Sequence, residues 1–160
     1  MPLHFQVMDE KTLFSDFWEK ESKTTSKVIS RIPDGSDYRP DPKSRTAAEI
    51  AWQIVCEEKM LIDALESGKA EWAPAPTPPT MKAVLEAYEQ QSAGMEPRWS
   101  ALPADRWDRP VEFFGSQRSV SSIAWGFLFD IIHHRGQLTT YLRPMGSSVP
   151  QVYGPTADEP

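Results

Sequence analysis

An aspartate and a histidine stand four residues apart in a largely apolar stretch, as Asp130 and His134. In an α-helix this spacing places both side chains on one face, one above the other. A carboxylate oxygen and an imidazole nitrogen held in this way can ligate a divalent metal ion, or the carboxylate can simply orient the ring by hydrogen bonding. His133 is rotated away by about 100° in the same helix. The spacing by itself leaves both interpretations open.

Residues 119–146, SVSSIAWGFLFDIIHHRGQLTTYLRPMG, carry this pair and predict one long helix. Ser119 is a suitable N-cap because its hydroxyl can accept a hydrogen bond from a free N–H of the first turn. Pro144 and Gly146 mark the end, since proline lacks an N–H and glycine tolerates a positive φ. The apolar side chains recur at helical spacing and predict a buried face: Ile123, Phe127, Ile131, Leu138 and Leu142.

A second helix is predicted to begin after Thr46, because Thr46 and Glu49 have the spacing of a capping box. Gln53 and Glu57 lie one turn apart on it. The carboxylate of Glu57 would complete a three-ligand site with the aspartate–histidine pair, whereas the amide of Gln53 is a weak ligand for borderline metals. Glu57 and Glu58 fit a solvated acidic face equally well.

Two further helices are predicted, from about Asp9 to Ile32 and from Met81 to Leu102. The polar middle of the first, Lys20 to Lys27, is expected to bend outward or to face solvent. Pro97 is expected to kink the second or to begin a new turn there. Residues 103–118 contain VEFF and predict a short extended segment, and the proline-rich segments PDGSDYRPDPKS and EWAPAPTPPT predict loops.

Length and composition restrict the class of protein. The 160 residues predict a single domain over 1–160, and 39% hydrophobic and 25% charged residues are ordinary for a globular chain. A net charge of −6 without a basic stripe disfavours a nucleic-acid partner. The single cysteine, Cys56, fits a reducing compartment, and no signal peptide or apolar run of about 20 residues is present. We therefore expect a cytoplasmic protein with no membrane partner.

Four helical patterns joined by proline-rich loops predict an all-α antiparallel bundle. Six tryptophans exceed what such a core needs, so Trp52 and Trp125 are candidates to line a pocket, although packing is the ordinary role of this side chain. Arg135 can pair with an acid or hold an anionic substrate. These three residues are the pocket candidates.

The segment HHRGQLTTYLRPMG followed by VPQVYGPTADEP resembles the C-terminal signature of the DinB-like (YfiT-like) metalloenzyme superfamily. PDGSDYRPDPKSRTAAEIAWQIVCEEKML resembles the entry to that family's second helix. The resemblance extends from about Ile32 to Asp158 and implies an up-down-down-up four-helix bundle, often a homodimer, with nickel or zinc in the bundle. Relatives with assigned activity include thiol-dependent transferases and isomerases.

The family's metal site consists of three histidines, and this chain departs from it at two of them. His134 is present, but Asp130 replaces its helical partner and Gln53 replaces the histidine of the second helix. Oxygen donors shift preference from nickel and zinc toward harder cations and lower affinity. We therefore favour a degenerate metal site in which the three side chains hydrogen-bond one another and no metal is tightly bound.

Three functions remain as hypotheses. The first is a bundle that binds a small molecule in the family pocket without a tightly held metal. The second is a metal-dependent hydrolase or thiol-dependent transferase in which Asp130, His134 and either Glu57 or Gln53 hold the ion, which would lower the pKa of a bound water or thiol. The third is metal-free acid–base catalysis by the Asp130–His134 pair.

Overall fold

The computed structural model describes residues 8–160, so the first seven residues of the expected single domain lie outside it. Nearly all regular structure is helical, with a small three-stranded sheet at one end. The elements in chain order are α1 (Glu10–Ile29), α2 (Ala47–Ser67), β1 (Lys69–Ala70), α3 (Met81–Ala93), α4 (Met95–Ala101), a 3₁₀ turn (Ala104–Arg106), β2 (Pro110–Phe113), β3 (Ser116–Ser119) and α5 (Val120–Leu142).

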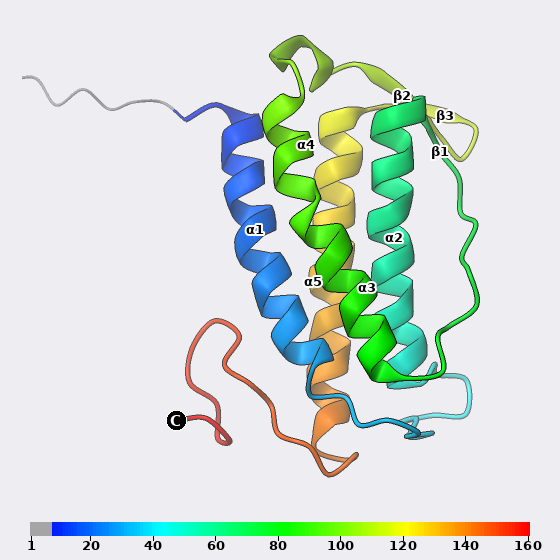
Figure 1. Ribbon diagram of the computed structural model, residues 1–160, viewed down its shortest axis with the longest axis vertical. Coiled ribbons are helices and arrows are strands. Elements are labelled where there is room, and N and C mark those ends of the chain that lie inside the picture. The colour runs from blue at the N-terminus through cyan, green and yellow to red at the C-terminus, as the bar shows by residue number, and fades with distance from the viewer. Residues whose placement is uncertain (1–7) are drawn as a thin grey trace, which may run out of the picture.

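The long helices form the predicted all-α, up-down-down-up four-helix bundle (Figure 1). α1 and α5 run in one direction, whereas α2 and the α3–α4 pair run in the other. The parallel step from α2 to α3 is made by residues 71–80, which pass along the outside of α2 from one end of the bundle to the other. α5 packs against α1 and α2, and α3 packs against the same two helices, so the site-bearing faces of α2 and α5 adjoin.

Two helices begin at the capping residues that the sequence predicted. The Thr46 hydroxyl accepts from the backbone N–H of Glu49 while the Glu49 carboxylate accepts from that of Thr46, which is the predicted capping box. The Ser119 hydroxyl accepts from the N–H of Ser122, as predicted for an N-cap. α5 ends at Leu142, within the expected range.

The predicted helix over 81–102 is instead two helices that meet at Gly94. Pro97 lies at the third residue of α4, where a missing N–H costs no intrahelical hydrogen bond. The helix therefore breaks three residues before the proline rather than at it. The first three residues of VEFF lie in β2, and Phe114 lies in the turn that follows. β2 pairs antiparallel with β3 and parallel with β1; the sequence did not predict β1.

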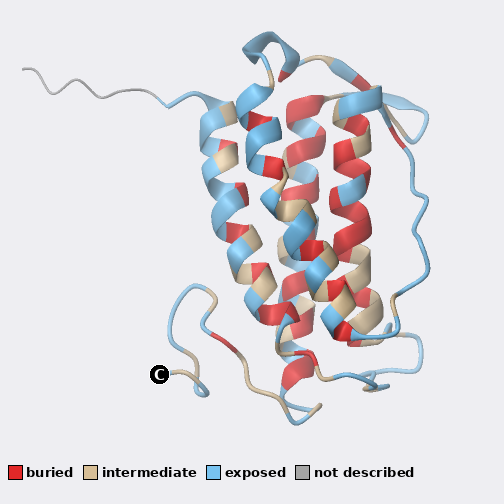
Figure 2. Cartoon of the chain, in the orientation of Figure 1, coloured by how far each residue is buried: buried red, intermediate tan, exposed pale blue. Residues whose placement is uncertain are grey.

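The core lies between the four helices, where the buried faces of the ribbon meet (Figure 2). Its upper part is aromatic: Trp99 contacts Phe14 edge-on, with ring centroids 4.8 Å apart, and Trp18 and Trp107 surround them. Each such ring buries a large apolar area, and the edge-on geometry adds favourable quadrupole contacts. Among residues 8–160 no helix is long and apolar enough to cross a membrane.

The polar middle of α1 faces solvent only in part: its three lysines are exposed, as expected for Lys20 to Lys27, but two of its polar residues are turned into the bundle. Glu21 and Thr25 are buried, and both accept hydrogen bonds from the guanidinium of Arg135 on α5. The hydroxyl of Tyr153, in the C-terminal segment, also donates to Glu21. A buried charge is tolerated when it is paired and hydrogen-bonded, so these polar residues join α1 to α5.

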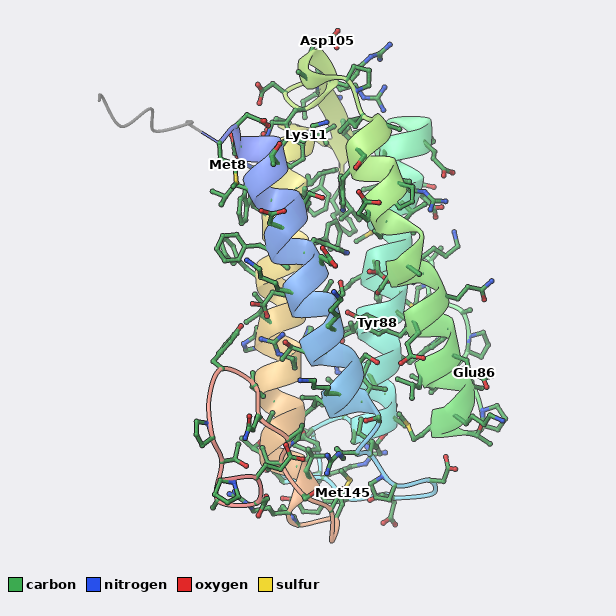
Figure 3. All side chains as sticks on the ribbon, turned by 60° about the vertical axis from the view of Figure 1, so that its left-hand side comes forward. Met8, Lys11, Glu86, Tyr88, Asp105 and Met145 are labelled. Carbon is green, nitrogen blue, oxygen red and sulfur yellow. The ribbon has the colours of Figure 1, made fainter. Side chains whose placement is uncertain are left out.

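Glu58 is a second buried charge, and it lies between α2 and α3. Its side chain is fully buried, and its carboxyl oxygens accept from the Ser92 hydroxyl and the Gln91 amide. Figure 3 shows Tyr88 of α3 turned toward this interior, while Glu86 projects from the other side of the helix. Burial raises the pKa of the Glu58 carboxyl from 4.5 to about 7, because desolvation disfavours the ionised form.

This pKa predicts a pH-dependent stability that Glu58→Gln removes. The folded protein holds the Glu58 proton to a higher pH than the unfolded chain, so stability falls as pH rises from about 4.5 to 7. The difference between the two pKa values corresponds to about 3 kcal/mol. Relative to wild type, Glu58→Gln should therefore be near neutral at pH 4.5 and stabilising by up to about this amount at pH 8, measured by urea unfolding. Parallel pH profiles for the two proteins would contradict the assignment.

Candidate metal centre

Two turns of α2 and two turns of α5 bring four polar side chains together. Glu57 on α2 lies opposite Asp130 and His134 on α5, and one ligand atom from each of the three lies within 4.8 Å of the other two. His134 Nε2 is 3.5 Å from Glu57 Oε1 and 3.7 Å from Asp130 Oδ2. Donor atoms that share one ion at about 2.1 Å lie roughly 3 to 3.5 Å apart, so the cluster is only slightly wider than a coordination site.

Gln53 lies between the two buried members of this cluster. Its amide nitrogen is 2.6 Å from Glu57 Oε1 and 2.6 Å from His134 Nε2. The other ring nitrogen, Nδ1, is 2.8 Å from Gln137 Oε1. One set of protons satisfies all three contacts: Nδ1–H donates to Gln137, and the Gln53 amide donates one hydrogen to the ring and one to the carboxylate. His134 then presents an unprotonated Nε2 to the cluster.

Two oxygens at the cluster are buried without a hydrogen-bond partner among residues 8–160. They are Gln53 Oε1 and Glu57 Oε2. Unpaired buried oxygens are costly, and they are the atoms that a metal ion would satisfy. The donor set therefore fits a cation: two carboxylates, one imidazole nitrogen oriented from behind by Gln137, and an amide oxygen that turns inward if the Gln53 amide rotates.

Charge accumulates at this point because both carboxylates face the ring. The hydrogen bond to Glu57 raises the pKa of His134, the bond to Gln137 adds to it, and Asp130 contributes through its charge, while burial opposes them. Protonating Nε2 would set two donors face to face, so the Gln53 amide must rotate when the ring is charged. Protonation of His134 and binding of a metal ion would thus both require the Gln53 amide to rotate.

Asp130 lies at the rim, with its side chain 50% exposed, whereas Glu57 and His134 are almost fully buried. It also lines a cavity of about 480 Å³ between α5 and the β2–β3 hairpin. The rest of the lining is Phe113, Arg118, Ser122, Ile123, Gly126, Phe127 and Phe129. The cluster therefore opens to solvent at Asp130, beside a space of ligand size.

None of the three predicted pocket residues lines this cavity. Trp52 donates its indole N–H to the carbonyl of Ala75 and lines a smaller cavity of about 220 Å³ under residues 71–75. Trp125 donates to Glu10 and stacks on Phe129. Arg135 is buried in its ion pair with Glu21, on the α1 side of α5.

A sequence model of the DinB family matches residues 8–160. The chain belongs to the DinB family. This DinB protein is 27% identical over 163 residues to the uncharacterized protein YrdA of Bacillus subtilis strain 168, with 97% of this chain and 93% of YrdA covered. The resemblance inferred from the HRGQ segment is confirmed.

Solved structures agree on the fold. A DinB-like protein from Bacillus cereus ATCC 10987 superposes with a TM-score of 0.77 at 24% identity, over 88% of this chain and 95% of that one. A second, YjoA from Bacillus subtilis, gives a TM-score of 0.70 at 19% identity, over 88% of this chain and 96% of that one. At these identities the likeness establishes the architecture of this DinB protein and not its chemistry.

Sequence reasoning found most of the cluster but not all of it. The spacing predicted that Asp130 and His134 share a face, and it named Gln53 and Glu57 as alternatives; the structure brings all four together. Gln137 was missed. Its signal was its position three residues after His134, one helical turn away on the same face.

The two adjacent glutamates of α2 provide a test of this geometry. Glu57→Gln should lower the pKa of His134, because the hydrogen bond and the charge of Glu57 are the main causes of its elevation. Asp130→Asn should lower the pKa of His134 by less than Glu57→Gln does. Glu58→Gln is the matched control and should leave it unchanged, since Glu58 bonds to Ser92 instead. The measurement is NMR titration of the His134 ring in chelator-treated protein.

The raised pKa of His134 also sets the sign of its contribution to stability as pH changes. Because the folded pKa of His134 lies above the ordinary 6.5, its contribution is full below that pH and is lost as pH rises through the folded value. A Glu57→Gln titration that matches wild type would place Glu57 outside the cluster.

Proposed function

We propose that this DinB protein binds a divalent metal ion reversibly through Glu57, Asp130 and His134, and uses it in hydrolysis of a small molecule. The observation that carries the proposal is the convergence of three ligand atoms within 4.8 Å beside Glu57 Oε2, which is buried and has no hydrogen-bond partner among residues 8–160. Three protein ligands leave further coordination positions open, which is the arrangement of catalytic rather than structural sites.

The donor set indicates which ions are favoured. Two carboxylates and one imidazole form a mixed oxygen and nitrogen set, harder than the three histidines that the family resemblance implies. Such a set suits Mn²⁺ or Fe²⁺ at least as well as Zn²⁺ and should bind Ni²⁺ less tightly than three imidazoles would. Reversible, moderate affinity also agrees with the expectation that no metal is tightly held.

When bound, the ion would act as a Lewis acid that lowers the pKa of a water molecule at an open position. The chain's own residues have separate tasks. Gln137 holds Nδ1 of His134 and thereby directs Nε2 inward. Glu57 supplies charge from the buried side. Asp130, exposed at the rim, can ligate through one oxygen and accept a proton from the attacking water at the other.

A thiol-dependent transferase is the second candidate for the metal-bound protein, as the family resemblance implies. Its thiol would have to come from a separate small molecule. Cys56, the single cysteine, is buried under residues 71–75, where burial raises the pKa of its thiol. A buried thiol with a raised pKa is a poor nucleophile.

A further candidate function is a metal-free binding or acid–base site. It is favoured by the two hydrogen bonds of the Gln53 amide, which satisfy Glu57 Oε1 and His134 Nε2 without an ion. In this alternative Asp130 and His134 would exchange protons with the ligand and chelators would have no effect.

Metal titration tests the proposal. Wild type purified without a chelator or a metal-affinity column should contain less than one equivalent by elemental analysis and take up about one equivalent of Mn²⁺ when titrated. Glu57→Gln should weaken binding by at least about 100-fold, because it removes a ligand rather than an outer contact. The adjacent substitution Glu58→Gln should not change it. Absence of Mn²⁺, Fe²⁺ and Zn²⁺ binding at millimolar concentration would overturn the proposal in favour of the metal-free site.

The double variant Gln53→His plus Asp130→His measures how far the site has departed from the family. It recreates three histidines and should retain about one equivalent of zinc or nickel through purification. Failure of this variant to bind any metal would mean that the α2 and α5 faces do not converge as the cluster requires.

We also propose the homodimer that the family resemblance implies and the cytoplasmic location that the composition predicted. Exposed apolar side chains of α1 support a surface that a second copy covers: Leu13 and Phe17, with Trp125 of α5 in contact with Phe17. Light scattering should give twice the chain mass for wild type. Phe17→Ser should shift the measured mass toward that of a single chain, because it removes an exposed aromatic ring from this surface. Serine is tolerated at an exposed position of a helix.

A further inference from the structure

We propose that the cavity between α5 and the β2–β3 hairpin binds a small carboxylate with an aromatic or similarly bulky apolar body. As the substrate class of the metal centre, this inference rests on the proposed function; as a binding site it stands on the cavity alone. Its lining combines aromatic walls, one arginine and, at the end near the cluster, Asp130.

The floor of the cavity is a row of residues on α5 that is inclined to the helix axis, because each four-residue step turns by about 40°. Ser122, Gly126 and Asp130 follow one another at four-residue spacing, and His134 continues the row into the cluster. From Ser122 to Asp130 the row spans about 12 Å along the helix axis. A molecule lying on this row therefore reaches from the start of α5 to the metal ligands.

Gly126 has no side chain, so the helix backbone itself forms the middle of this floor. A Cβ built at this position meets no atom within 4 Å, and the backbone is ordinary helix, so no packing or conformational need for glycine is visible. Glycine inside a helix costs about 1 kcal/mol relative to alanine. Glycine at such a place allows another group to approach the backbone closely, and the open space lies in a cavity beside a metal-ligand residue.

The walls indicate the body of the ligand. Phe113 comes from the hairpin, and Phe127 and Phe129 from α5; the Phe113 and Phe127 rings are 6.1 Å apart in edge-on contact. Phe129 is 61% exposed, an unusual state for a phenylalanine, and it lies at the opening. Aromatic side chains around an open cavity favour a planar or bulky apolar guest.

Arg118 indicates the charge of the ligand. It pairs with Val111 across the hairpin, and Val111 is buried, so both side chains are on the hairpin face that packs toward α5. Asp130 is the other charged residue of the lining, and it lies about two helical turns after Ser122 on α5. Within residues 8–160, Arg118 forms no ion pair and its guanidinium has no hydrogen-bond partner. It is thus an exposed cation with the fork geometry that binds a carboxylate, and Ser122 lines the same cavity.

These features fix the orientation. The carboxylate binds at Arg118 near the start of α5, where the helix dipole also favours an anion. The apolar body crosses Gly126 between the phenylalanines. The opposite end of the molecule then lies at Asp130, where the bond to be hydrolysed would meet the metal centre.

The experiment compares three probes that differ only in their polar end: 3-phenylpropionate, 3-phenylpropanamide and 3-phenylpropylamine. Binding is measured by NMR titration or calorimetry on the full chain, once with chelator and once with Mn²⁺. In chelator the carboxylate should bind about tenfold more tightly than the amide, and the amine should bind most weakly. Arg118→Gln should remove this preference while leaving amide binding unchanged, since only the charge-assisted bond is lost.

Gly126→Leu fills the floor and should weaken binding of the carboxylate by at least about tenfold. Gly136→Leu is the matched control: this glycine is also on α5, a Cβ there also meets no atom within 4 Å, and it lies outside the cavity. Both substitutions replace a helical glycine by leucine, so any gain in helix stability is shared. Thermal unfolding and light scattering verify that both variants are folded and have the wild-type mass.

The outcomes separate the two proposals. Equal binding of carboxylate and amide, or wild-type binding by Gly126→Leu, overturns the ligand assignment even if Mn²⁺ binds normally. Carboxylate binding with the expected Arg118 dependence, but no Mn²⁺ uptake, sustains the site and overturns the metal centre. A change of mass confined to Gly126→Leu would make the cavity an interface between copies of the chain and overturn the inference.

Discussion

The contact between Glu57 and His134, bridged by the amide of Gln53, is the interaction on which the candidate site depends. It is made inside the bundle, where a lone carboxylate or imidazolium would be costly. The chain meets this constraint by pairing buried charges between helices: His134 with Glu57 across α5 and α2, and Arg135 with Glu21 across α5 and α1. Glu58 instead accepts hydrogen bonds from neutral side chains of α3. Adjacent residues of α5 thus point to different neighbours, and together they set the rotation of that helix about its axis.

The local elements could be predicted wherever one side chain decides the backbone. Thr46 and Ser119 cap helices in the predicted manner because a hydroxyl near free N–H groups acts within a single turn. The polar middle of α1 was misjudged at its two buried residues, because polarity alone does not identify the solvent face when an arginine lies opposite. Glu21 and Thr25 have no such partner within their own sequence segment; it comes from Arg135, 110 or more positions away.

The candidate site shows the same contrast between features set within one helix and features set by packing between helices. Helical spacing fixed that Asp130 and His134 share a face, a property of one helix. Whether Gln53 or Glu57 reaches them depends on the axial offset between α2 and α5, which is a packing outcome. The structure agrees with the alternative that names Glu57, whose carboxylate oxygen lies with the ligand atoms of Asp130 and His134. It adds that the Gln53 amide lies between Glu57 and His134. β1 and the position of the cavity depend in the same way on how the chain returns across the end of the bundle.

Under the proposed function, the Gln53 amide would make the affinity for a metal ion moderate. Its N–H group carries partial positive charge and satisfies the carboxylate and the ring nitrogen, which is what a cation would do there. An incoming ion must displace two hydrogen bonds, worth about 2 to 3 kcal/mol together, which weakens binding roughly 30- to 150-fold. Rotation of the amide returns part of this cost, because it turns the unpaired Oε1 toward the ion. A histidine at position 53 has no primary amide to bridge the two groups in this way, so in the proposed centre glutamine would favour an exchangeable ion over a tightly held one.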